Sequence, residues 1–369
     1  MPWRFRPGNA WVALLPWLVV GLEAALAVAF VVDQAQGNAR GIDFQLNVWE
    51  PVQRLADDSS PYAPPGTLAE RGATYGYPPL TALVFLPLAV LPYKAALALF
   101  ALMLAAASVG AVWAVGVRSL PCLLLVLFSL PVVGACYWGN PSPLVVLAGA
   151  LAWRWRDSRW RAPLTVALGT AIKFLLWPLV AWLALTGRPR AALRAGALVV
   201  VAVLLPWALI GFDGFTAYPD LLRELRDAGA GKGLLAHAAA ERLGAPTGVA
   251  TAVGLALAIG LLAVAARVRT DRSAFGLAIL AGLLASPLAW SYYLAAFAVL
   301  IAIWRPAFSP IWLVVPAIWL DADIFGITPG LTNALALGLC ALLTAWLVQN
   351  AREHRAPALA PVAPTSTWR

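Results

Sequence analysis

The chain has 369 residues, of which 62% are hydrophobic and only 12% are charged, and its mean hydropathy is +0.80. Soluble domains carry about 25% charged residues, so this composition excludes a soluble globular protein and predicts an all-α, polytopic transmembrane bundle. The 26 basic and 17 acidic residues give a net charge of +9, which we assign to cytoplasmic loops and contacts with membrane lipid. No nucleic-acid partner is expected.

The first apolar run covers residues 11–32, which is long enough to cross a hydrocarbon core of about 30 Å. Because Arg4 and Arg6 precede it, the positive-inside rule places the N-terminus in the cytoplasm. Residues 33–78 then form an external loop that contains six acidic residues. This loop is the longest polar stretch of the chain and the first place to look for chemistry.

Prolines and charges predict breaks in the next apolar blocks. Residues 80–117 exceed one span, and Pro92 should divide them into a half-helix and a full span. Residues 163–185 lie between two arginine runs, both of which should face the cytoplasm, and carry Lys173 near their middle. We therefore expect either a tight hairpin or broken helices with Lys173 near the turn.

The rest of the chain predicts further crossings and a second external loop at residues 211–245. A hairpin should turn at Ser286-Pro287, after an earlier turn at Gly139-Asn140. Together these features predict about 10–12 spans, including broken or re-entrant helices, with both termini cytoplasmic. We expect one domain over residues 1–355 and a disordered cytoplasmic tail over residues 356–369.

Asp43 is the first candidate for catalysis, because a carboxylate held at the outer membrane surface can serve as a general base. The alternative is an ordinary solvated loop acid. Tyr62, Tyr75 and Tyr77 stand where the chain re-enters the bilayer, so they are either interface anchors or a wall for a sugar or lipid headgroup.

Lys173 is the strongest anomaly of the sequence. A lysine in an apolar block costs about 3 kcal/mol to insert, so it should either pair with an anion or snorkel to a nearby surface. A lipid-linked phosphate is the anion that we expect there, with Arg71 of the first external loop as a second cation. The three cysteines and two histidines are scattered, so neither a metal site nor a cofactor is expected.

An ordered series of short motifs over residues 41–290 resembles glycosyltransferase family 87 of the C-type superfamily, whose members use polyprenyl-phosphate sugars. The motifs are Asp43-Phe44, Pro61-Tyr62, Tyr77-Pro-Pro-Leu80, Phe85-Leu-Pro-Leu88, Leu91-Pro92, Gly139-Asn140, Lys173 within residues 169–173, and Ser286-Pro287 with Trp290. The resemblance implies a multi-span fold whose first external loop carries the catalytic acid, here Asp43.

The resemblance also implies inverting transfer of a hexose, with mannose favoured, from a polyprenyl phosphate to a lipid or glycan hydroxyl. The reaction would take place at the outer face of a bacterial cytoplasmic (inner) membrane. Our own inference is that Lys173 and Arg71 contact the donor phosphate. The expected substrate contacts are Tyr62, Tyr75, Tyr77, Asn140, Trp290, Tyr292 and Tyr293.

Two positions depart from the family pattern. Asn140 stands where the family usually has glutamine, and Tyr292 and Tyr293 stand where it usually has histidines. Two other interpretations are also open, and the second departure supports the latter of them. One is a transporter or flippase of lipid-linked glycans, which would also use broken helices and a buried lysine. The other is a non-catalytic subunit of an envelope-assembly complex.

Overall fold

The computed structural model describes residues 10–37, 40–62, 75–268, 270–321 and 326–354. Every regular element in these ranges is a helix, which confirms the predicted all-α architecture. The α-helices are α1 (Ala10–Ala35), α2 (Ile42–Phe44), α3 (Glu50–Ala56), α4 (Pro79–Phe85), α5 (Tyr93–Ala114), α6 (Leu120–Phe128), α7 (Leu130–Trp138), α8 (Ser142–Arg154), α9 (Arg161–Ile172), α10 (Pro178–Leu185), α11 (Pro189–Leu209), α12 (Tyr218–Ala228), α13 (Ala236–Arg242), α14 (Thr247–Arg267), α15 (Asp271–Ala285), α16 (Ala296–Trp304), α17 (Val314–Ala317) and α18 (Pro329–Glu353). The other helical segments are the π-helix η1 (Gln45–Trp49) and the 3-10 helices η3 (Leu86–Val90), η4 (Ser291–Ala295), η5 (Pro310–Leu313) and η6 (Ile318–Asp321).

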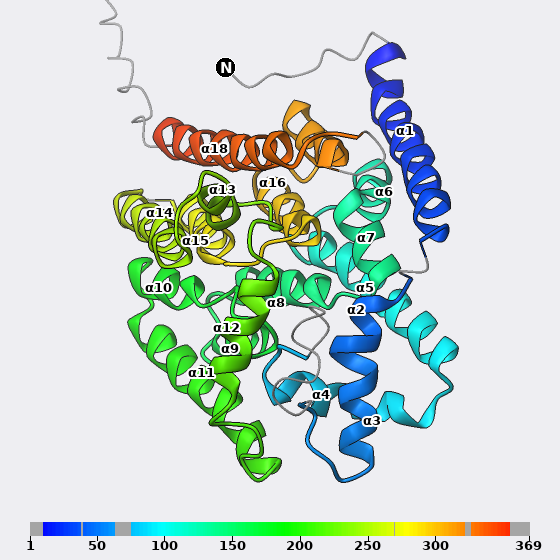
Figure 1. Ribbon diagram of the computed structural model, residues 1–369. Helices are drawn as coiled ribbons and strands as arrows, with labels where there is room; N and C mark the ends of the chain where they lie inside the picture. Colours follow the sequence, from blue (N-terminus) through cyan, green and yellow to red (C-terminus); the bar gives the residue numbers. More distant parts are fainter. Residues whose placement is uncertain (1–9, 38–39, 63–74, 269, 322–325, 355–369) are drawn as a thin grey trace, which may run out of the picture.

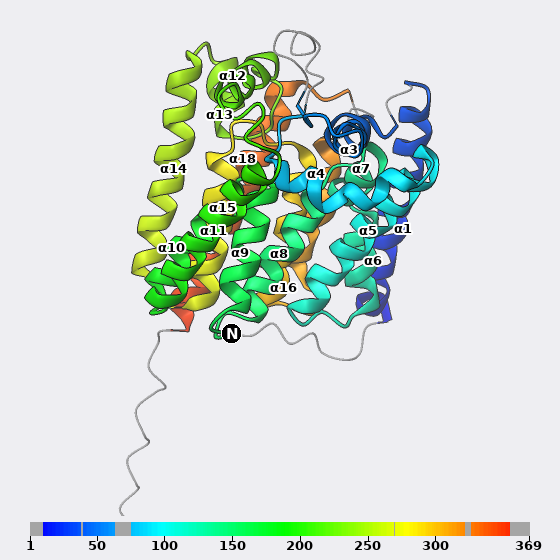
Figure 2. The ribbon, with the colours of Figure 1, turned by 90° about the horizontal axis from the view of Figure 1, so that it is seen from below.

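The long helices pack side by side as a bundle (Figure 1), and several of them run lengthwise between the same two ends (Figure 2). In the described ranges, α1, α5, α11, α14 and α18 are each long and apolar enough to cross a membrane. The bent pair of α6 and α7 adds a sixth crossing when it is taken as one span. The chain is therefore a multi-pass membrane protein. The larger number of spans expected from sequence also counted short apolar helices such as α8 and α16.

Two helix breaks follow the sequence prediction. Pro92 separates a short helical stretch, α4 with η3, from the full-length α5. In the second case α9 ends at Ile172, Lys173 adopts an extended conformation, and α10 begins at Pro178. The lysine thus lies at a break between two helices, which agrees with the predicted alternative of broken helices with Lys173 near the turn.

A third break, between α6 and α7, was not predicted. The two helices meet at an angle of 49° around Ser129, whose backbone is extended. Pro131 explains the break, because its ring has no N–H to donate and would clash with the preceding turn of a continuous helix. Ser129 Oγ donates to the carbonyl of Val126 at 2.8 Å and so satisfies one of the freed carbonyls.

The two loops that the sequence predicts to be external contain more helix than hydropathy suggested. The first loop holds α2, η1 and α3, and the second holds α12 and α13. The helices α3, α12 and α13 gather at the same end of the bundle (Figure 2). None of the residues of α12 is buried, which explains why a search for apolar runs did not reveal it as a helix.

Ion pairs bring the two arginine runs together. Arg188 Nη2 lies 2.9 Å from Asp157 Oδ1 and 2.8 Å from Asp271 Oδ2, and Arg156 Nε lies 3.2 Å from the same Asp271 oxygen. These contacts join the segment after α8, the segment before α11 and the start of α15. Both arginine runs therefore lie at one end of the bundle, as the predicted hairpin of residues 163–185 requires.

Candidate functional site

Seven polar side chains from distant parts of the sequence meet in one group, which we call the polar cluster. They come from α2, from the segment before α4, from the turn after α7, from the first residue of α8, from the break after α9, and from η4. The members of the polar cluster are Asp43, Tyr77, Asn140, Ser142, Lys173, Tyr292 and Tyr293.

Asn140 lies at the centre of the polar cluster and is 2% exposed. Its Nδ2 donates to Asp43 Oδ2 at 2.7 Å and lies 3.4 Å from the Tyr77 hydroxyl. Its Oδ1 accepts from Ser142 Oγ at 2.7 Å and from Lys173 Nζ at 3.2 Å. One amide thus joins a carboxylate to an ammonium group, so each buried charge has a hydrogen-bonded partner and a nearby opposite charge.

The end of α7 explains why the Asn140 side chain reaches Asp43. Gly139 adopts a left-handed conformation, with φ +78, and the N–H groups of Gly139 and Asn140 both donate to the carbonyl of Ala135. Glycine favours this conformation, and a Cβ at position 139 would also overlap Phe44. The close approach lets α2 pack directly against the end of α7.

Backbone contacts fix the position of Asp43. The N–H of Gly41, another residue with positive φ, donates to the carbonyl of Tyr137 at 2.9 Å. Phe44, next to Asp43, is fully buried and packs on Phe100 with a ring-centroid distance of 5.1 Å. These contacts hold the residues on both sides of Asp43, whose side chain is half-buried. An acid in a mobile loop would lack such contacts.

Lys173 is 7% exposed and makes three polar contacts inside the protein. Its Nζ donates to Ser142 Oγ at 2.8 Å and to Asn140 Oδ1 at 3.2 Å, and it lies 3.9 Å from the ring centroid of Tyr293. The lysine therefore does not snorkel to a surface. Hydrogen bonds, the aromatic face and the Asp43 charge offset the cost of burying it.

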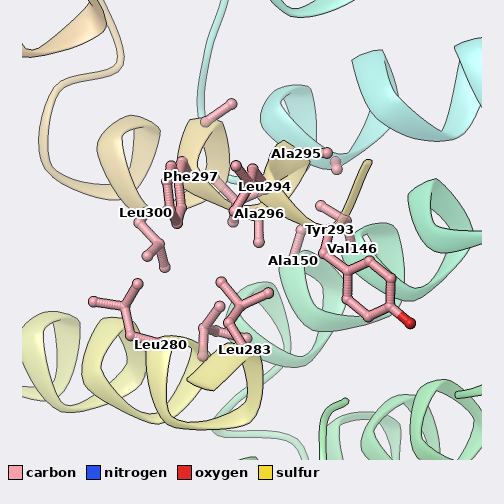
Figure 3. Close-up of a cluster of buried hydrophobic side chains, with 14 of the residues drawn as sticks. Val146, Ala150, Leu280, Leu283, Tyr293, Leu294, Ala295, Ala296, Phe297 and Leu300 are labelled. Carbon is pink, nitrogen blue, oxygen red and sulfur yellow. The ribbon is translucent and has the colours of Figure 1, made fainter. Parts of the chain in front are cut away.

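Tyr292 and Tyr293 complete the polar cluster from η4. Their rings stack at a centroid distance of 5.6 Å, and both side chains are buried. The Tyr292 hydroxyl hydrogen-bonds the Asp43 carboxylate. Tyr293 stands at the edge of the apolar core with its hydroxyl pointing away from it (Figure 3), and this hydroxyl hydrogen-bonds Ser286. Two tyrosines thus line the polar cluster where the family usually has histidines.

The surroundings of Asp43 change its proton affinity. Burial raises the pKa of Asp43 above the ordinary aspartate value, because a charged carboxylate is disfavoured away from water. The hydrogen bond from Asn140, the charge of Lys173 and the hydrogen bond from Tyr292 lower the pKa by smaller amounts. A carboxylate with a raised pKa accepts a proton more readily than an exposed one, which suits a general base.

Tyr62 and Tyr75 belong to a separate group, which we call the aromatic cluster. It consists of Tyr62, Tyr75, Trp207 and Tyr218. Tyr62 stacks on Trp207 at 5.0 Å with an interplanar angle of 8°, and its hydroxyl donates to the carbonyl of Tyr77 at 2.9 Å. The Tyr75 hydroxyl donates to the carbonyl of Pro78 at 2.7 Å. These tyrosines support the segment that carries Tyr77, and both hydroxyls donate to backbone carbonyls.

Two candidates remain, Trp290 and Arg71. Trp290 is half-buried and packs against the main hydrophobic core. Arg71 lies outside the described residues. Among the described residues, no three His, Cys, Asp or Glu side chains gather in a way that could hold a metal ion.

Sequence reasoning missed Ser142, which contacts both Asn140 and Lys173. Its signal was weak, because a serine between two prolines at a helix start is ordinary turn chemistry. The polar cluster reveals its role, since Ser142 is fully buried and donates to Asn140 Oδ1 while it accepts from Lys173 Nζ.

Comparison with known proteins identifies the family. The sequence model of glycosyltransferase family 87 matches residues 75–291, more than half of the chain. This range includes Tyr77, Asn140, Ser142 and Lys173 of the polar cluster. Asp43 precedes the range, and Tyr292 and Tyr293 follow its last residue directly. No curated protein and no solved structure matches the chain. The chain belongs to glycosyltransferase family 87 and is a membrane glycosyltransferase.

Proposed function

We propose that this glycosyltransferase moves a hexose, with mannose as the first candidate, from a polyprenyl phosphate to a hydroxyl of a lipid or glycan. The observation that carries the proposal is the half-buried Asp43 carboxylate, joined through Asn140 to the buried ammonium of Lys173. Such an arrangement offers a base for the acceptor and a positive charge for the phosphate within one group of side chains.

In the proposed reaction, Asp43 takes the proton of the acceptor hydroxyl while its oxygen attacks the anomeric carbon of the sugar. The bond between that carbon and the phosphate oxygen breaks, and polyprenyl phosphate leaves with the bonding electrons. Attack from the face opposite the phosphate inverts the anomeric centre. Asn140 and Tyr292 hold the carboxylate in place by hydrogen bonds.

Lys173 would stabilise the departing phosphate through its charge. An ammonium group has three N–H donors, and two of them are engaged by Asn140 and Ser142. We therefore expect Lys173 both to hold Asn140 in place and to provide positive potential for the leaving group, with Arg71 as the second phosphate contact. Tyr77, Tyr292 and Tyr293 would offer ring faces or hydroxyls to the sugar.

We place the reaction at the outer face of the bacterial inner membrane. The arginine runs gather at one end of the bundle, whereas α2 and α3 lie toward the other end (Figure 2). The positive-inside rule makes the arginine-rich end cytoplasmic, together with both termini. Lys173 of the polar cluster directly follows α9. Because α9 has 12 residues, the lysine then lies about 18 Å from the cytoplasmic start of this helix, toward the external side.

The test is sugar transfer by purified protein in liposomes, with a radiolabelled polyprenyl-phosphate sugar and a panel of glycolipid acceptors. We expect Asp43→Asn to reduce kcat by about 100-fold or more, because the amide cannot accept the proton. The matched control is Asp33→Asn, which removes an exposed carboxylate near the end of α1 and should leave kcat within about twofold of the wild type.

A second assay follows movement of the same labelled lipid between the two leaflets. Transfer that survives in Asp43→Asn would remove the proposed role of the carboxylate. Lipid movement without product, for any donor and acceptor, would instead favour the transporter interpretation. Absence of both activities would favour a non-catalytic subunit.

A further inference from the structure

A second concentration of charge lies far from the polar cluster, at the arginine-rich end of the bundle. Here a surface cavity of about 570 Å³ opens between the segment after α8 and the start of α11. Five arginines line it, against a single carboxylate, that of Asp157. The arginines are Arg156, Arg159, Arg188, Arg190 and Arg194.

The charges in this cavity are only partly compensated within the protein. Asp157 and Asp271 pair with Arg156 and Arg188. Among the described residues, no ion pair involves any of the other three arginines. A cavity with three uncompensated guanidinium groups attracts an anion, and guanidinium binds phosphate oxygens through paired hydrogen bonds. The three are Arg159, Arg190 and Arg194.

The position of the cavity indicates where the anion comes from. Arg159 and Arg194 lie over the ring of Trp160, at 5.7 and 5.1 Å, and this tryptophan is 52% exposed. Leu193, beside Arg194 in sequence, is 79% exposed. Exposed tryptophan and leucine next to arginine are typical of the level where the lipid headgroups meet the acyl chains.

We propose that this cavity binds the phosphate headgroup of an anionic phospholipid in the adjoining leaflet. The three uncompensated arginines contact the phosphate, Trp160 lies at the level of the glycerol backbone, and the acyl chains run along the exposed apolar faces of α9 and α11. Leu164 on α9 and Val201 on α11, at 47% and 52% exposed, belong to these faces. Bound lipid would fill the space between the two arginine runs and hold the α9 to α11 region together from outside.

The experiment titrates protein purified in a neutral detergent with phosphatidylglycerol or phosphatidylcholine of equal chain length, and counts bound lipids by native mass spectrometry. We expect one retained phosphatidylglycerol and no comparable retention of phosphatidylcholine. The combined variant Arg159→Gln, Arg190→Gln and Arg194→Gln should weaken retention by about 100-fold, which corresponds to about fivefold for each arginine.

The matched control removes three exposed arginines at other positions, through Arg118→Gln, Arg305→Gln and Arg352→Gln. This variant loses the same net charge and should retain the lipid within about threefold of the wild type. The single variant Arg190→Gln serves if the triple variant does not fold, because Arg190 is exposed, and it should weaken retention by about fivefold.

Three results would overturn the proposal. Equal losses in the cavity and control variants would show that net charge alone attracts lipid. Equal retention of both lipids would show that the headgroup charge is not recognised. Complete displacement of the lipid by excess inorganic phosphate would show that the cavity takes a soluble phosphate and not a lipid.

Discussion

The polar cluster and the aromatic cluster meet at Tyr77, whose hydroxyl lies beside Asn140 and whose carbonyl accepts from Tyr62, and both clusters contain buried tyrosines. In the aromatic cluster the hydroxyls bond backbone groups, as Tyr218 does with the carbonyl of Gly76 at 3.0 Å. In the polar cluster the Tyr77 and Tyr292 hydroxyls lie beside Asn140 and Asp43. The same residue type therefore supports a chain segment on one side and faces the proposed chemistry on the other.

This difference separates residues that hold the site together from residues that would act on the substrate. Tyr62, Tyr75 and Trp207 fix the segment before α4, because ring stacking and two backbone hydrogen bonds restrict it. Changes in the aromatic cluster should therefore lower stability with little effect on turnover. Changes in the polar cluster should do the reverse, except where they leave a buried charge without a partner.

Among the variants that keep Asp43, the largest effect should come from Lys173→Met. It removes the positive charge beside Asp43 and leaves Asn140 Oδ1 and Ser142 with fewer partners. We expect kcat to fall by about 100-fold, since an electrostatic contact to the leaving group is lost. The control is Lys94→Met at the exposed start of α5, which should retain activity. Comparable activity in the two variants would contradict any role for Lys173 in transfer.

Asn140 should give the next largest effect. Asn140→Ala removes a side chain that hydrogen-bonds both Asp43 and Lys173, and we expect a loss of about 10- to 100-fold in kcat/KM. Asn140→Gln restores the residue that the family usually carries and keeps both amide groups, so it should lose less than the alanine variant. If alanine and glutamine lower kcat/KM equally, the bridging contacts do not matter to turnover.

Gly139→Ala tests how α2 is held against α7. An alanine would need a left-handed conformation at a cost of about 1–2 kcal/mol, and its methyl group would push Phe44 and thereby Asp43 away. We expect both a lower Tm and a lower kcat. Gly260→Ala in α14 is the control, because the added methyl group meets open space. An unchanged Tm and kcat in Gly139→Ala would show that the contact with Phe44 is dispensable.

The pH dependence of transfer should report the Asp43 carboxylate. A base must be deprotonated, so activity is lost as pH falls through the pKa of Asp43, which burial raises above the ordinary value of about 3.9. The acid limb of the profile should therefore lie above that value. In Lys173→Met it should move to still higher pH, because the lysine charge lowers the pKa. The residual activity of this variant is sufficient for the measurement, and a limb that stays in place would exclude electrostatic coupling.

The smallest effect on turnover should come from Tyr62→Phe. It deletes the hydroxyl that donates to the Tyr77 carbonyl, and we expect a loss of about 1 kcal/mol in stability with kcat within about threefold of the wild type. Tyr77→Phe is the matched change on the other side and should alter kcat/KM more than Tm. The reverse pattern would merge the two clusters into one functional unit.

Much of the fold was predictable from hydropathy, proline positions and arginine runs. These signals identified the break at Pro92 and, as one of two alternatives, a helix break near Lys173. The bend at Ser129 was missed, although Pro131 accounts for it, because the apolar run through both helices is continuous. The helix α12 was missed because none of its residues is buried.

For the candidate site, the sequence indicated every member of the polar cluster except Ser142, but none of their contacts. Asp43, Asn140 and Lys173 each stood out as a polar residue close to apolar segments. Periodicity describes neighbours along one helix, so it cannot predict a hydrogen bond between residues 97 positions apart, such as that from Asn140 to Asp43. For the same reason Tyr62 and Tyr75 could not be separated from Tyr77 before the structure placed their hydroxyls on backbone carbonyls.

The attachment of Asp43 to the end of α7 has a consequence for biosynthesis. Gly41 and Phe44 leave the ribosome long before Tyr137 and Gly139, the residues they dock against, and Tyr292 emerges later still. During synthesis, the Asp43 carboxylate therefore lacks the hydrogen bond from Tyr292 until the η4 segment is inserted. Truncated translation products that end before η4 lack Tyr292, so they contain a base without its full set of hydrogen-bond donors.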